Sequence, residues 1–150
     1  MAETYRGRLM HVQPVLADEV YAFFQNCYHL KDWLLNDPAS ASAAADVEKF
    51  ISRTPSLALC ADLANGSKHL TLTRSRRHAE GTPSLATTRF KGRVEPGGIM
   101  VSAQFEVSAG DQTLDAYALA VDCWEAWNAY LEAKGLITVR VVPPYVPPRG

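Results

Sequence analysis

Hydrophobic residues recur at the helical period over the first third of the chain. Between residues 16 and 36 they occupy one broad face, which predicts a first amphipathic helix. Its apolar positions are Leu16, Val20, Phe23, Phe24, Cys27, Leu30, Leu34 and Leu35. We expect the helix to end at Asp37-Pro38, because proline disfavours helical backbone in the residue that precedes it.

Two further helices are predicted after the alanine- and serine-rich connector 39–45. Asp46 is a candidate N-cap for a short helix, since its carboxylate can accept from free backbone N–H groups. Thr54 and Pro55 are typical of the cap and first residue of a longer third helix. Gly66 in its interior costs about 1 kcal/mol relative to alanine. That cost predicts either a close backbone neighbour or an early helix end.

The pattern changes after this third helix. Residues 71–88 are polar and irregular, which predicts a flexible segment. Residues 87–94 and 99–108 are strand-like, and 95–98 between them is rich in turn residues. The second run alternates between apolar and polar positions, as a half-buried strand does. This pattern predicts a β-hairpin.

The remaining residues predict the strongest helix and an extended end. After a connector at 109–113, apolar positions cover a wide face over 114–134, and Gly135 supplies a helix stop. Residues 136–142 could form a short edge strand. The proline-rich stretch after them favours polyproline II, because proline lacks the N–H that sheet pairing needs.

The elements together define the expected fold. We predict a helix-dominated α+β protein, a bundle of about four helices with a β-hairpin inserted before the last long helix. Residues 1–142 would form one globular domain and 143–150 a proline-rich tail. A chain of 150 residues is long enough to bury a core without staples.

Charge changes this picture only locally. The formal net charge is -1, so bulk charge predicts neither a nucleic-acid coat nor an acidic tail. From Lys68 to Arg93, however, basic residues greatly outnumber the single acid, Glu80. This segment indicates either an anionic partner or a solvated loop, with equal weight.

The three cysteines, Cys27, Cys60 and Cys123, lie far apart in sequence and form no Cys-x-x-Cys pair. Each sits in an apolar helical setting, where cysteine usually acts as a small hydrophobe. We therefore predict a reducing compartment, and with no signal core or membrane-length apolar run, a cytoplasmic location. No Glu-x-x-His pair or close cysteine–histidine spacing is present, so we predict no metal and no cofactor.

The densest reactive side chains fall in the third predicted helix. Asp62, Asn65 and His69 are spaced at i, i+3 and i+7, so a helix would align them on one stripe. His69 could act as a general acid or base, with Asp62 and Asn65 orienting a substrate and Lys68 binding phosphate. The alternative is a hydrogen-bonded polar seam that fixes helix packing.

A second group lies on the first predicted helix. His29 and Asp32 share a stripe nearly opposite the apolar face, which favours a solvated surface. The alternative is that this stripe faces the hairpin or a partner and joins His69 in one site.

The segment from Ala64 to His69 resembles the Arg-Asn-x-x-x-His motif of the HEPN superfamily. Asn65 and His69 match the motif at the correct separation, and Ala64 occupies the position of its arginine. The resemblance implies a small helical protein that acts on RNA, usually as a dimer, of a bacterial or phage defence or toxin–antitoxin type. Arg74, Arg76 or Arg77 could replace the missing charge and bind phosphate.

Two functions follow as expectations. The first is a domain that binds RNA or another phosphate-bearing ligand and could act as a metal-independent ribonuclease, although the missing arginine leaves enzymatic activity undecided. The second is a non-enzymatic module that binds a protein partner, such as an immunity, antitoxin or adaptor protein. The wide apolar faces of the first and last helices are compatible with a homodimer.

Overall fold

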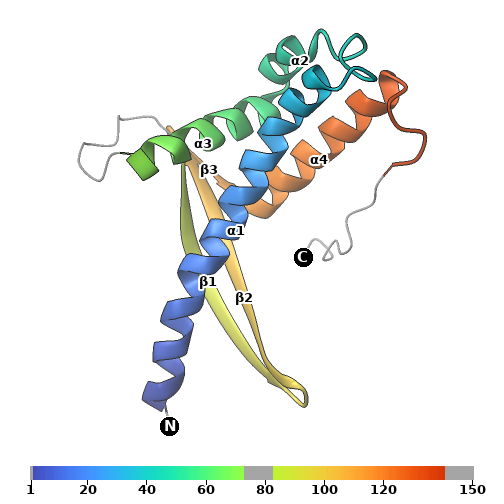
Figure 1. The fold of residues 1–150 in the computed structure, drawn as a ribbon. Helices are drawn as coiled ribbons and strands as arrows, with labels where there is room; N and C mark the ends of the chain where they lie inside the picture. The colour runs from blue at the N-terminus through green and yellow to red at the C-terminus, as the bar shows by residue number, and fades with distance from the viewer. Residues whose placement is uncertain (1, 73–82, 141–150) are drawn as a thin grey trace.

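The computed structural model describes residues 2–72 and 83–140, with side chains described for 17–66, 83–85, 94, 96–98 and 103–140. Within these residues the chain forms four helices and a three-stranded antiparallel sheet (Figure 1). The elements in chain order are α1 (Ala2–Asn36), α2 (Val47–Arg53), α3 (Pro55–Leu72), β1 (Ser84–Glu95), β2 (Gly98–Ala109), β3 (Gln112–Asp115) and α4 (Ala116–Ala133). The predicted fold class, helix-dominated α+β with a hairpin before the last helix, is confirmed.

Helix α1 is longer than the sequence pattern predicted. It begins at Ala2 rather than near Leu16, and its backbone remains helical through Pro14. The prediction was wrong because residues 2–15 lack the apolar period and contain a proline, which cannot donate a helical hydrogen bond. In Figure 1 this first half of α1 runs past the β1–β2 hairpin, and the second half packs with α3 and α4.

The caps around α2 differ from the prediction. Asp46 does precede α2, but its side chain makes no capping hydrogen bond. Its carboxylate instead accepts from Tyr130 Oη and Lys134 Nζ of the α4 end, both at 2.8 Å. Thr54 Oγ1 donates to the Phe50 carbonyl at 2.9 Å, so this side chain closes α2. Asp46 therefore ties the start of α2 to the end of α4, whereas Thr54 closes the last turn of α2.

Helix α3 continues through Gly66 to Leu72, so of the two alternatives for Gly66 the early helix end is excluded. Part of the predicted flexible segment 71–88 lies in β1, which begins at Ser84; residues 73–82 lie outside the described part. The hairpin is longer at both ends than predicted, with Glu95 opposite Gly98 at its turn.

Two further elements correct the sequence-based prediction. The expected connector 109–113 instead forms a tight turn into β3, where Gly110 has a φ of +59° and Ala109 pairs with Gln112. The expected edge strand at 136–142 is not seen in its described residues, 136–140. There Arg140 bonds Glu125 and Glu132, which holds this segment against α4. The proline-rich tail, with 141 and 142, lies outside the described residues.

The core lies where α1, α3 and α4 meet, and one end of it is closed by β2. Its largest fully buried side chains are Phe24, Leu57, Leu63, Val47, Val107, Cys60 and Cys123. At the other end Phe50 of α2 stacks on Tyr130 with ring centroids 4.4 Å apart. No helix among the described residues is long and apolar enough to span a membrane.

Helix α4 ends as its sequence predicted. Gly135 has a φ of +69°, and the Leu136 N–H donates to the Leu131 carbonyl at 2.9 Å. This left-handed turn satisfies the free carbonyls of the last helical turn. It also directs the following segment back toward α4.

Candidate functional site

The stripe predicted to carry catalysis lies on α3. Asp62 and Asn65 are exposed, whereas Leu63 and Ala64 between them are buried. The exposure of Asp62 and Asn65 argues against a buried polar seam at these two positions. Lys68 and His69 belong to α3 by backbone, but their side chains lie outside the described part, as do Arg74, Arg76 and Arg77 entirely. The catalytic assignment and the replacement of the motif arginine therefore stay predictions.

The second predicted group forms a local contact on α1. His29 Nδ1 and Asp32 Oδ2 are 2.8 Å apart, and both side chains are partly exposed. The hydrogen bond from His29 lowers the pKa of Asp32, with a smaller contribution from the Lys31 charge. Lys31 itself pairs with Glu48 of α2. The group thus belongs to a surface network of charged side chains between α1 and α2.

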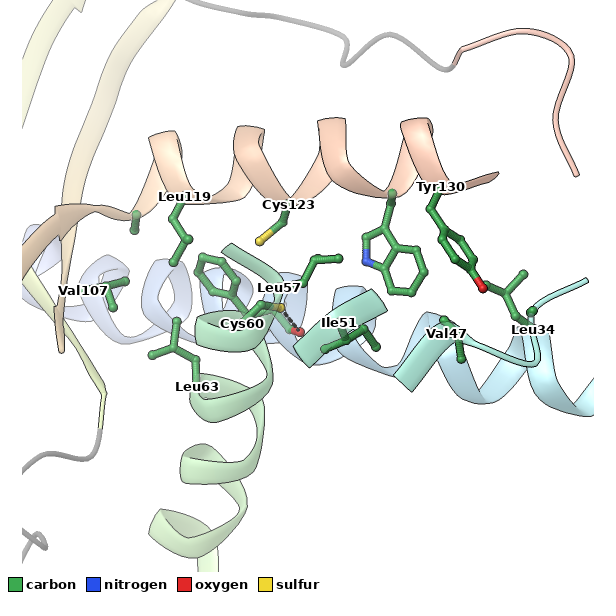
Figure 2. Close-up of a cluster of buried hydrophobic side chains, with 14 of the residues drawn as sticks. Leu34, Val47, Ile51, Leu57, Cys60, Leu63, Val107, Leu119, Cys123 and Tyr130 are labelled. Carbon is green, nitrogen blue, oxygen red and sulfur yellow. Dashed lines mark hydrogen bonds between the residues drawn. The ribbon is translucent and has the colours of Figure 1, made fainter. Parts of the chain in front are cut away.

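The sequence-based reasoning missed a cluster of the three cysteines. Cys27 of α1, Cys60 of α3 and Cys123 of α4 place their Sγ atoms within 4.8 Å of one another. Figure 2 shows Cys60 and Cys123 projecting from facing helices into the space between them. Cys60 and Cys123 are fully buried and Cys27 is half-buried. No other described histidine, aspartate or glutamate belongs to this group.

The helical period explains why each thiol points inward. Cys27 lies three residues after Phe24, Cys60 three after Leu57, and Cys123 four after Leu119, so each shares a buried stripe with a core residue. The apolar setting of each cysteine was therefore readable from the sequence. Their convergence depends on how three helices are rotated against one another, which no local pattern specifies.

The two buried thiols are held by helix carbonyls. Cys60 Sγ donates to the Phe24 carbonyl at 3.2 Å, drawn as a dashed line in Figure 2, and Cys123 Sγ donates to the Ser56 carbonyl at 3.3 Å. Hydrogen bonds with Cys123 and Cys27, and burial, raise the pKa of Cys60. The hydrogen bond with Cys27, and burial, raise the pKa of Cys123. The thiols of Cys123 and then Cys60 lower the pKa of Cys27 well below its usual range. The three side chains thus interact with one another, and Cys27 is the one whose pKa falls.

Trp127 lies beside this cluster, and its buried indole nitrogen lacks a hydrogen-bond partner within the described part of the chain. Its side chain is buried, and its indole Nε1 reaches no hydrogen-bond acceptor among the described residues. The indole N–H lies toward Cys27 but outside hydrogen-bonding geometry, and it lowers the pKa of that residue less than the two thiols do. A buried donor without a partner costs about 1–3 kcal/mol, so this atom marks a place where an anionic neighbour would be stabilised.

A pocket of about 380 Å³ between α1 and α4 reaches the cluster at Cys27. Its walls are mainly apolar, and its other lining residues with polar groups are Asn26, Asn128, Trp124 and Trp127. Among the described residues Cys27 is the one member of the cluster that lines this pocket, since Cys60 and Cys123 lie behind it. The pocket therefore borders the cluster on the side of Cys27.

The spacing of the sulfur atoms fits a metal or metalloid ion. Three thiolates bound at about 2.3 Å around an ion in their own plane would lie about 4.0 Å apart. The observed separations, all within 4.8 Å, require shifts of less than about 1 Å. Thiolates select soft ions such as Cu(I) and Zn²⁺ over hard ones. The arrangement can therefore hold a thiophilic ion with three sulfur ligands.

Comparisons of the chain with protein-family models, curated proteins and solved structures found no match.

Proposed function

We propose that the protein binds a thiophilic metal or metalloid ion through Cys27, Cys60 and Cys123. The observation that carries this proposal is the convergence of three sulfur atoms from three different helices within 4.8 Å. Buried cysteines that serve only as small hydrophobes need contact with apolar neighbours, not with one another. The proposal replaces our expectation that the chain binds no metal.

The surroundings of the cluster support binding of an ion from solution. Cys27 lines a pocket, and Cys60 and Cys123 are fully buried in the core. Both thiols donate to backbone carbonyls inside helices. Each of these carbonyls also accepts the helical hydrogen bond from the N–H group four residues further along. Losing the thiol protons therefore leaves neither carbonyl without a partner.

The experiment uses the full-length chain, reduced and freed of metal, with Cd²⁺ as the probe. We expect one equivalent to bind with a thiolate-to-metal absorption band, and Cys27→Ser to weaken binding and reduce the band. Ile51→Val is the matched control, since it removes one buried methyl group outside the cluster. Unchanged Cd²⁺ binding in folded Cys27→Ser and Cys123→Ala variants would contradict the proposal.

Binding of RNA or another phosphate-bearing ligand remains a second candidate function. The exposure of both Asp62 and Asn65 on α3 supports it, because a ligand-facing stripe must be accessible. Under this hypothesis the purified protein cleaves or binds RNA in EDTA, and His69→Ala abolishes cleavage. RNA binding that does not weaken with salt would argue against it, since phosphate contacts release counterions.

A further inference from the structure

We infer that the Cys27–Cys60–Cys123 site takes a trivalent metalloid, As(III) or Sb(III), in preference to a monovalent or divalent metal ion. This inference rests on the proposed function, since it names the class of ion that the same three sulfur atoms bind. It follows from the charge around the cluster, from the number of ligands and from the pocket beside Cys27.

The first argument is charge balance. Three thiolates leave a net charge of −2 around a monovalent ion and −1 around a divalent one, but zero around As(III) or Sb(III). Three basic side chains on or just after α1 and α4 form ion pairs with surface carboxylates. Lys31 pairs with Glu48, Lys134 with Asp46, and Arg140 with Glu125 and Glu132. Burying an uncompensated charge is strongly unfavourable. With all three sulfur atoms deprotonated, only the trivalent ion gives a neutral centre.

The second argument is the number of ligands. A structural zinc site is almost always tetrahedral and takes four ligands from the protein. The cluster supplies three, and no described histidine or carboxylate is close enough to add a fourth. The amide of Asn128 points its Nδ2 at the Trp124 carbonyl, 3.1 Å away. As(III) and Sb(III) form three bonds in a pyramid and carry a lone pair, so three sulfur atoms complete their coordination.

The pocket beside Cys27 suits the side of a pyramidal three-sulfur centre that carries no ligand. A pyramidal As(SR)₃ centre presents a lone pair opposite its three sulfur atoms and needs no further polar contact there. The walls of the 380 Å³ pocket include Phe23, Leu30, Leu131 and Ile137, which offer no ligand to a metal ion. Because Cys27 is the cluster member exposed to this pocket, we expect the first bond to form at Cys27 and the bonds to Cys60 and Cys123 to follow.

The chemical step is balanced without an oxidant or reductant. Arsenous acid, As(OH)₃, is neutral at physiological pH and can enter an apolar pocket. Three As–O bonds break and three As–S bonds form, and each released hydroxide leaves with one thiol proton as water. Arsenic stays trivalent throughout, so the product is neutral As(SR)₃ and three water molecules.

The test is competition between ions on the full-length reduced chain. We expect arsenite to bind with one arsenic atom per chain in non-denaturing mass spectrometry, and to displace bound Cd²⁺. Cys27→Ser should weaken arsenite binding by about 10²–10⁴-fold, because the third bond is intramolecular once two have formed. Cys27 is half-buried, so serine at this position should leave the fold intact, which circular dichroism checks.

A second reagent separates loss of a ligand from loss of the site. Phenylarsine oxide forms only two As–S bonds, so Cys27→Ser should retain its binding through Cys60 and Cys123, and Cys123→Ala through the remaining pair. Arsenite affinity that is unchanged in Cys27→Ser would overturn the inference. Tight Cd²⁺ binding that excess arsenite cannot displace would overturn it and leave the proposed function standing. Binding of neither ion would overturn both.

Discussion

Replacing Trp127 with phenylalanine should change stability far less than its burial suggests. Trp127 is 5% exposed and packs edge-on against Tyr130, with ring centroids 5.8 Å apart. Its Nε1 reaches no hydrogen-bond partner among the described residues. The substitution therefore removes two buried carbon atoms and one unsatisfied donor, and it keeps an aromatic ring in place.

The two effects oppose each other. Loss of two buried carbons costs about 1.6 kcal/mol at about 0.8 kcal/mol each. Removal of an unsatisfied buried donor returns about 1–3 kcal/mol. The free energy of unfolding should thus lie between about 0.6 kcal/mol below and about 1.4 kcal/mol above that of the unmodified protein.

Urea denaturation in reducing buffer with EDTA measures this difference without a bound ion. Phe24→Leu is the matched control, since Phe24 is 1% exposed and the change removes three buried carbons and no polar atom. By the same scale it should cost about 2.4 kcal/mol. If Trp127→Phe costs as much as Phe24→Leu, the indole N–H has a partner and the reasoning fails.

Two further predictions concern the C-terminal end of α4. Asp46→Asn should destabilise the protein at about pH 6, and this effect should shrink as the pH falls below about 4, because hydrogen bonds from Lys134 and then Tyr130 lower the pKa of Asp46. The carboxylate stabilises the fold above its unfolded pKa, and this stabilisation is lost as pH falls through its folded pKa. Urea denaturation of the variant and the unmodified protein measures the difference in unfolding free energy, and a difference that does not change with pH would contradict this. Gly135→Ala should cost about 1 kcal/mol, because φ is +69° there while the added methyl group meets no atom within 4 Å. An unchanged melting temperature for that variant would show that the left-handed turn does not persist.

The fold class could be predicted because its signals are local. The apolar period of α4 and the stop at Gly135 lie within one segment, and both are confirmed. Strand β3 was missed because its four residues become a strand only by pairing with β2. Asp46 was misread as a cap because its real partner, Tyr130, is 84 positions away in the sequence.

In the candidate site, too, features with local signals could be predicted and features that depend on distant contacts could not. Each cysteine could be assigned to an apolar helix face, but only the rotation of α1, α3 and α4 brings the three sulfur atoms together. The motif-like stripe on α3, by contrast, was recognised from spacing alone. Its Asp62 and Asn65 are exposed, and its proposed cations lie outside the described residues.

The most direct test of the proposed ion site is X-ray absorption spectroscopy of the reduced chain loaded with one equivalent of Cd²⁺ and, separately, of arsenite. The method counts the sulfur, oxygen and nitrogen neighbours of the bound ion. We predict three sulfur neighbours, supplied by Cys27, Cys60 and Cys123, and no oxygen or nitrogen neighbour for arsenic. Fewer than three sulfur neighbours for both ions would contradict the account.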